Sequence, residues 1–244
     1  MQTRLKLGRI AGIDVFVHVT FFLLLLWVAF ANWRHEQSLA DVLVGIMLVV
    51  MIFACVTLHE YGHALMARRY GISTKDIILL PIGGVARLEK MPERPVEELW
   101  VALAGPAVNV VIAVALFLWL HLTASLAPLE QVSLTTGPVA ERLLAVNVFM
   151  ILFNLIPAFP MDGGRVLRAL LATRVDYAGA TRIAAGIGQA IAIVFGVAGL
   201  LYYPLLMVIA AFVWIGAAQE AHQTGMLARI GGVSVEQAME RDFQ

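Results

Sequence analysis

The run VLVGIMLVVMIFACVTL, from Val42 to Leu58, contains no charged side chain. It is followed at once by His59-Glu60-Tyr61-Gly62-His63. A helix needs about 17–25 mainly apolar residues to cross a bilayer. Ionisable side chains at membrane depth are costly and usually functional. The sequence therefore predicts a membrane-spanning helix that carries a functional site at its end.

The composition agrees with a membrane protein. The 244 residues are 61% hydrophobic and 14% charged, with a mean hydropathy of +0.85, whereas soluble domains are about half apolar and a quarter charged. The formal net charge is +0 and no basic block of the nucleic-acid-binding type is present, so no nucleic-acid partner is expected. A single cysteine, Cys55, excludes an internal disulfide. We expect it to be a small buried side chain, with a metal-ligand role as the alternative.

The fold class that we predict is an all-α polytopic membrane protein. Six stretches are candidate transmembrane helices. They are Val17–Trp33, Val42–Ala67, Leu99–Ala124, Leu143–Ile156, Ala180–Leu200 and Pro204–Ala221.

The basic residues orient these six helices. With the N-terminus in the cytoplasm, 15 of the 17 Lys and Arg lie on the cytoplasmic side, and only Arg34 and Arg142 lie on the other. This bias predicts that both ends of the chain are cytoplasmic. A cleavable signal peptide is the alternative for the first apolar stretch, but a retained helix fits better because that stretch continues to Trp33.

A small membrane-associated β-hairpin is expected between the second and third helices. Residues Ile77 to Leu88 are apolar and β-branched around the pair Gly83-Gly84, a pattern typical of a hairpin. Irregular backbone at membrane depth must be covered by protein or line a wet cavity. A simple surface hairpin is the alternative.

The H-E-x-x-H motif has the spacing of a zinc site. Residues four apart project from one face of a helix, so His59 and His63 can reach one ion together. Glu60 lies about 100° round the helix from His59 and can act on a water without binding the metal. The motif predicts hydrolysis of a peptide bond in which Glu60 is the general base.

A catalytic zinc needs a third protein ligand. Asp162 is a candidate because the second and fourth predicted helices run in the same direction, so their ends meet on one side of the membrane. Pro157 and Pro160 interrupt the helix, and Gly163-Gly164 then permits close backbone approach. An ordinary Asp-Gly turn is the alternative. The remaining histidines are expected to be interfacial polar residues: His18, His35, His121 and His222.

At this point the chain resembles the site-2 proteases, the intramembrane zinc metalloproteases. The first matching element is His59-Glu60-Tyr61-Gly62-His63-Ala64, and the second is Asn154-Leu-Ile-Pro-Ala-Phe-Pro-Met-Asp162-Gly-Gly. The second follows the family's N-x-x-P-x-P-x-x-D-G pattern, with its second proline one position late. A third element, Ala104-Gly105-Pro106-Ala107-Val108-Asn109, resembles the family's A-G-P-x-x-N.

The resemblance implies roles for particular residues. Zn²⁺ would be bound by His59, His63 and Asp162. Glu60 would be catalytic, and Asn154 would lie near the substrate carbonyl, with an interhelical hydrogen bond as the alternative. The hairpin at Gly83 and Gly84 would bind substrate as an added strand, while Asn109 would be a structural or a substrate-binding residue.

The function that we expect is an intramembrane endopeptidase that cleaves a transmembrane segment of another membrane protein. The alternatives are a membrane metal transporter or non-catalytic metal-binding protein, and a membrane metallopeptidase acting on soluble or lipidated peptides. We expect a prokaryotic cell membrane as the location. The oligomeric state does not follow from the sequence.

Two parts of the chain are expected. Residues 1–222 would be the protease domain, and 223–244 a cytoplasmic tail. Val233 to Phe243 resembles the opening of a CBS domain, a nucleotide-binding module that one branch of the family carries, and would then be cut short here. A short amphipathic tail is the alternative.

Overall fold

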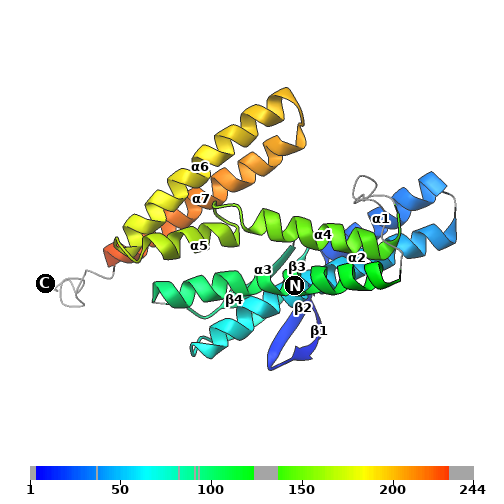
Figure 1. Ribbon diagram of the computed structural model, residues 1–244, viewed down its shortest axis with the longest axis horizontal. Coiled ribbons are helices and arrows are strands. Elements are labelled where there is room, and N and C mark those ends of the chain that lie inside the picture. The colour runs from blue at the N-terminus through cyan, green and yellow to red at the C-terminus, as the bar shows by residue number, and fades with distance from the viewer. Residues whose placement is uncertain are drawn as a thin grey trace, which may run out of the picture. The chain divides into compact units, whose positions relative to one another are not determined.

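The structure of the protein is a computed structural model that describes residues 4–36, 38–81, 83–90, 92, 94–123 and 137–230 (Figure 1). It divides into two compact units, Met1–Asn154 and Leu155–Gln244. The first unit contains β1 (Arg4–Ile10), β2 (Ile13–His18), α1 (Thr20–Glu36), α2 (Leu39–Arg69), β3 (Thr74–Leu80), β4 (Gly83–Leu88), α3 (Pro95–Leu122) and α4 (Val139–Asn154). The second contains α5 (Asp162–Leu171), α6 (Tyr177–Leu201) and α7 (Leu205–Ile230).

Four helices are long and apolar enough to cross a membrane by length and composition, as counted over the described residues. They are α2, α3, α6 and α7. The protein is therefore an integral membrane protein. The six predicted spans are not confirmed as six. α1 is a shorter apolar helix that begins at Thr20 instead of Val17, because Val17 and His18 belong to β2. α4 has 16 residues and ends at Asn154, three residues before Pro157.

The predicted hairpin between the second and third helices is present, but it is part of a larger sheet that was not predicted. The structure has a four-stranded sheet in the order β1-β2-β3-β4. β3 and β4 form the predicted antiparallel hairpin, but Leu80 pairs with Gly83, so the Gly83-Gly84 pair opens β4 instead of forming the turn. β2 joins it in parallel with β3, and β1 adds an antiparallel outer strand.

The N-terminal strands come from a sequence that alternates with a period of two. Ile13, Val15 and Val17 are buried while the residues between them are more accessible. A two-residue turn at Ala11 (φ 51°) and Gly12 (φ 84°) connects β1 to β2. These strands were not predicted from the sequence for two reasons. Ala-Gly is a weaker hairpin signal than Asn-Gly, and the apolar end of β2 is followed almost directly by the apolar residues of α1.

One face of the sheet packs on α2. The shared core contains Ile13, Val15, Val17, Phe21, Phe53, Tyr61, Ala64, Ile77 and Leu79. The Tyr61 hydroxyl also donates a hydrogen bond of 3.1 Å to the carbonyl of Ile10. The sheet therefore fixes the part of α2 that carries the H-E-x-x-H motif.

A cross-strand ion pair stabilises the β3–β4 hairpin. Asp76 lies opposite Arg87, and the Arg87 Nε donates to Asp76 Oδ1 over 2.6 Å. The Arg87 guanidinium also bonds Asp76 Oδ2, and Arg4 lies 3.7 Å from the same oxygen. These contacts, led by the hydrogen bond from Arg87, lower the pKa of Asp76.

The lowered pKa makes the stability of the hairpin depend on pH. A carboxylate whose pKa is depressed on folding stabilises the fold above its unfolded pKa, and that contribution disappears as pH falls through the folded value. We expect Asp76→Asn to lower the unfolding free energy at pH 7 by roughly 1–3 kcal/mol. The difference from wild type should shrink below the ordinary pKa of Asp. Thermal unfolding in detergent between pH 7 and pH 3 checks this, and a difference that grew with acid would contradict it.

The second unit is built on a helical hairpin of α6 and α7, which lie side by side (Figure 1). Its core contains Phe159, Ala184, Ala185 and Ala217. The small residues of α6 allow this close packing. The ten-residue amphipathic helix α5 was not predicted, because it is too short to cross a bilayer.

The C-terminal part of the chain that the structure describes is helical. α7 runs on to Ile230, eight residues past the expected end of the domain at residue 222. The segment that resembles the opening of a CBS domain, Val233 to Phe243, lies outside the described residues. The division of the chain at residue 222 and the CBS assignment stay predictions.

Candidate metal centre

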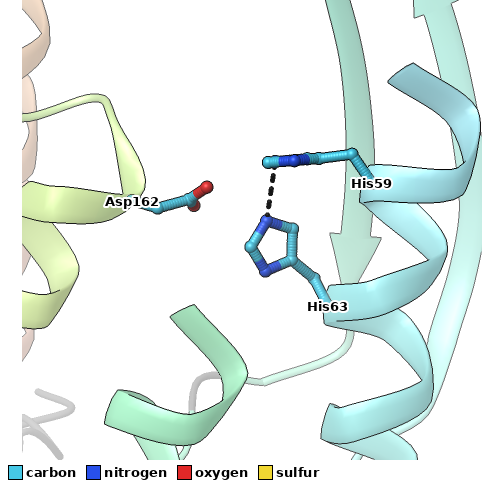
Figure 2. Close-up of side chains that lie close together, drawn as sticks. All are labelled: His59, His63 and Asp162. Carbon is cyan, nitrogen blue, oxygen red and sulfur yellow. Dashed lines mark hydrogen bonds between the residues drawn. The ribbon is translucent and has the colours of Figure 1, made fainter. Parts of the chain in front are cut away.

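The two motif histidines lie together on one face of α2. Both are buried, His59 with 4% and His63 with 5% of their surface exposed. Their Nε2 atoms face each other at 3.1 Å (Figure 2). This is the arrangement expected from a spacing of four residues on a helix.

The other ring nitrogen of each histidine, Nδ1, lies within hydrogen-bond distance of a carbonyl oxygen. His63 Nδ1 lies 2.7 Å from the backbone carbonyl oxygen of Val101, and His59 Nδ1 lies 2.5 Å from Asn109 Oδ1. A carbonyl oxygen has no hydrogen to donate, so both Nδ1 atoms carry the proton. In the neutral rings both Nε2 atoms then present lone pairs, and two lone pairs at this separation are stabilised when one cation accepts both. The pair therefore fits a metal ion, with the hydrogen-bonded second nitrogen that metal-binding histidines usually have.

Space for the imidazoles comes from a glycine on the neighbouring helix. A Cβ added at Gly105 of α3 would lie 2.8 Å from His59 Nε2 and still closer to His63 Nε2. The α2 and α3 backbones are also close, since a Cβ at Gly62 would lie 2.5 Å from the Ala104 carbonyl oxygen. Gly105 leaves room for the metal-binding edges of the two rings, and Gly62 lets the two helix backbones approach.

The side chain of Glu60 lies between α2 and β4, the edge strand of the sheet at the end opposite β1. The backbone N–H of Ala86 on β4 donates to Glu60 Oε2 over 3.0 Å. β4 comes this close because Gly84 has no side chain. A Cβ there would lie 2.7 Å from Glu60 Cγ and 3.0 Å from Val56 Cγ1. Gly84 thus lets the edge of β4 lie against the carboxylate.

Asp162 belongs to the second unit and is the first residue of α5, where it is labelled in Figure 2. It is buried, with 7% of its surface exposed, and a carboxylate suits the positive end of a helix dipole. Gly163 and Gly164 permit the close approach predicted for them. A Cβ at Gly163 would lie 2.5 Å from the Leu155 carbonyl oxygen, and one at Gly164 would lie 2.7 Å from the Ala158 backbone.

A buried arginine, Arg168, packs against the loop before Asp162 within the second unit. Arg168 of α5 is completely buried. Its guanidinium lies over the rings of Phe159 and Tyr177, 5.0 and 4.9 Å from their centres. Its Nη1 lies 2.5 Å from Glu220 Oε1 of α7. No pattern in the sequence predicts this arrangement, because an arginine in a short segment that also contains Arg165 resembles a surface residue.

The two asparagines and the cysteine that the sequence singled out all lie within the first unit. Asn154 ends α4, and its Nδ2 donates to the Met150 carbonyl oxygen over 3.0 Å, so its role near a substrate stays a prediction. Asn109 is fully buried against His59, and its substrate-binding role also stays a prediction. Cys55 is buried, as expected. Its sulfur lies 3.5 Å from Asn147 Nδ2.

Two of the other histidines make ordinary contacts. His18 Nδ1 lies 2.7 Å from the Thr20 hydroxyl oxygen, and the ring of His121 stacks on Phe117. Sequence reasoning missed Val101 and Asn147. Val101 acts through its backbone, which no side-chain pattern reveals, whereas an asparagine inside an apolar stretch is a signal that could have found Asn147.

Comparison with known proteins gives consistent matches. The family model described as Peptidase family M50 matches residues 47–142 and 130–195. A zinc metalloprotease of Methanocaldococcus jannaschii is 35% identical over 222 residues, which cover 91% of this chain and 61% of that protein. Stage IV sporulation protein FB of Bacillus subtilis is 30% identical over 136 residues, covering 55% of this chain and 44% of that protein. The chain therefore spans less than two thirds of the length of these curated relatives.

A solved structure is also similar over the whole length. The site-2 protease from Methanocaldococcus jannaschii shares 35% sequence identity with this chain at a TM-score of 0.63, covering 99% of this chain and 100% of that one. The family model alone spans more than half of the chain and includes the histidine pair and the loop before α5. The chain belongs to peptidase family M50.

Proposed function

We propose that the protein is an intramembrane zinc endopeptidase. The observation that carries this proposal is the pair of buried imidazoles on α2, whose Nε2 atoms face each other at 3.1 Å while each Nδ1 bonds an acceptor on α3. Such a pair in a peptidase family M50 chain fits a metal ion better than it fits a structural role in an apolar helix.

The residues that would bind the ion are His59, His63 and Asp162. Two imidazoles and one carboxylate are a common ligand set of catalytic zinc, and Asp162 offers a buried carboxylate at a helix start. A bound zinc ion would act as a Lewis acid and activate a water at neutral pH. The chain's own residues orient the rings, exclude lipid and move protons.

Glu60 would be the general base. It follows His59 directly on α2 and points toward β4, where the Ala86 N–H fixes one carboxylate oxygen. The other oxygen would take the proton of the attacking water and return it to the leaving amine. A glutamate in this position needs no further ligand role, since the two histidines already occupy the metal-facing side of the helix.

The substrate would bind as an extra strand on β4. This strand is the outer member of the sheet next to Glu60. Since the Ala86 N–H points away from β3, alternation along the strand points those of Gly84 and Leu88 the same way. An unwound transmembrane segment has backbone groups that need partners, and strand addition supplies them. The side-chain amide of Asn154 would lie near the carbonyl group of the scissile bond and could donate a hydrogen bond to it.

The substrate class would be a transmembrane segment of another membrane protein, cut near the cytoplasmic face. The short helices α1 and α4 would also lie in the bilayer, which accounts for exposed apolar side chains such as Leu23, Leu26 and Trp27. At 1.5 Å per residue their length is about 25 Å, close to a bilayer core. Both chain ends would face the cytoplasm of a prokaryotic cell, as the basic residues indicate.

The test is cleavage by the purified protein in detergent. We expect a substrate with a single transmembrane segment to be cut, the cut to be lost on treatment with a zinc chelator, and zinc to restore it. Asp162→Ala should bind far less zinc by elemental analysis and should not cleave. Asp176→Ala removes a carboxylate from the start of α6 in the same unit and should retain zinc. Zinc uptake into proteoliposomes without any cleavage would instead show a transporter and overturn the proposal.

A further inference from the structure

Asn147 of α4 has no assigned role, yet it is fully buried beside the metal centre. It lies within the first unit, on the far side of Asn109 from His59. Its Oδ1 accepts a hydrogen bond of 2.8 Å from Asn109 Nδ2. Its Nδ2 donates over 2.8 Å to the Leu143 carbonyl oxygen, one turn earlier on its own helix. A line of hydrogen bonds therefore crosses three apolar helices from α4 to α2.

The direction of every bond in this line follows from one backbone group. The Leu143 carbonyl oxygen can only accept, so Asn147 must turn its NH₂ group toward it and its Oδ1 toward Asn109. Asn109 must then turn its own NH₂ group toward Asn147. Its Oδ1 consequently faces His59, where it can accept only from a protonated Nδ1.

Without Asn147, only a weak hydrogen bond of 3.7 Å from Asn109 Nδ2 to the Met150 sulfur would hold the Asn109 amide. An amide rotated by 180° about its last bond would present NH₂ to His59 and favour the other ring tautomer, in which Nδ1 accepts and Nε2 carries the proton. A protonated Nε2 cannot bind a metal. His63 needs no such relay, because a backbone carbonyl, that of Val101, accepts directly from its Nδ1.

We propose that Asn147 is a positioning residue of the metal centre. It fixes the orientation of the Asn109 amide and so keeps His59 in the tautomer whose Nε2 binds the ion. This inference rests on the proposed zinc site. Partners that orient metal-binding histidines typically change metal affinity by about 10- to 100-fold when removed, and we expect an effect in that range although Asn147 touches neither histidine.

The experiment measures the zinc dissociation constant of the full chain in detergent by competition with a chromogenic chelator. Asn147→Leu removes the acceptor for Asn109 and should weaken zinc binding by about 10- to 100-fold. Asn147→Asp retains an oxygen for Asn109, and its protonated form can still donate to the Leu143 carbonyl, so it should restore most of the affinity. Where Asn147→Leu does not fold, Asn147→Ser replaces it. Its short hydroxyl bonds its own helix and does not reach Asn109.

A matched control separates orientation from packing. Asn32 of α1 makes the same local bond, from its Nδ2 to the carbonyl oxygen of Val28 four residues earlier, and touches no part of the line from Asn147 to His59. Asn32→Leu should leave zinc affinity unchanged even if it lowers the melting temperature.

The outcomes distinguish the two proposals. Wild-type affinity in Asn147→Leu or Asn147→Ser, or a loss that Asn147→Asp does not restore, overturns the positioning role and leaves the zinc site standing. A wild-type protein that binds no zinc overturns the proposed function and this inference with it. Solid-state nitrogen NMR of labelled histidine gives a readout independent of metal, since His59 should carry its proton on Nδ1 in wild type and lose that preference in Asn147→Leu.

Discussion

Replacing Glu60 by glutamine should abolish cleavage of a transmembrane substrate while leaving zinc bound. Glutamine has nearly the same size as glutamate, and its side-chain oxygen can still accept the hydrogen bond from the Ala86 N–H on β4. The fold around α2 and the edge of the sheet should therefore be unchanged. What glutamine cannot do is take a proton from a water molecule, and losing a general base typically costs about 10²- to 10⁴-fold in rate.

The measurement compares rate and metal content in one preparation. Glu97→Gln is the matched control, because Glu97 is a partly exposed residue in the first turn of α3 whose partner Arg94 is exposed, and a surface pair of this kind contributes little. It should cleave at the wild-type rate. If Glu60→Gln cleaved as fast as Glu97→Gln at equal zinc content, Glu60 would not be the base.

Replacing Gly105 by alanine should remove the metal without unfolding the protein. The added Cβ would lie 2.8 Å from His59 Nε2 and closer still to His63 Nε2. The atoms it meets are the far ends of two side chains, which can rotate away, so the helices need not separate. Such a rotation would move both Nε2 atoms away from the positions in which they can bind one ion. Alanine also stabilises a helix relative to glycine by about 1 kcal/mol. We expect stability near that of wild type, together with a loss of zinc and of cleavage.

The control for this change is another helical glycine of an apolar helix. A Cβ at Gly186 of α6 would meet no heavy atom within 4 Å, so Gly186→Ala should retain zinc and cleavage. Elemental analysis and thermal unfolding of both variants decide the matter. Normal zinc content in Gly105→Ala would show that the ion is not bound between these imidazoles and the α3 backbone.

Much of the candidate site could be predicted from local sequence. His59 and His63 share a face because helical geometry puts residues four apart on one side, and the apolar run before them places that face in a membrane protein. The glycines after Asp162 also act as predicted, because a missing Cβ has the same consequence wherever two backbones approach.

The sheet could not be predicted in full. β2 joins β3 through a parallel pairing of Asp14 with Asp76 and of Val17 with Leu79. These partners are separated by the whole of α1 and α2, and no local pattern announces them. The alternation of Ile13, Val15 and Val17 was present in the sequence, but it runs directly into the apolar residues of α1. The first predicted span also begins later than expected, at Thr20, because Val17 and His18 belong to β2.

Composition and helical periodicity act over short distances along the chain, so the amino-acid sequence alone predicts an integral membrane protein with the imidazoles of His59 and His63 near the end of a long apolar helix. The orientation of these imidazoles depends on contacts between helices, which exist only in the folded protein. The proton positions on His59 and His63 depend on the Val101 carbonyl and on an asparagine relay from α3 and α4, and the space for both rings depends on Gly105. Hydrogen bonds and steric contacts between helices join residues about 40 to 90 positions apart, and their geometry exists only once the helices have packed.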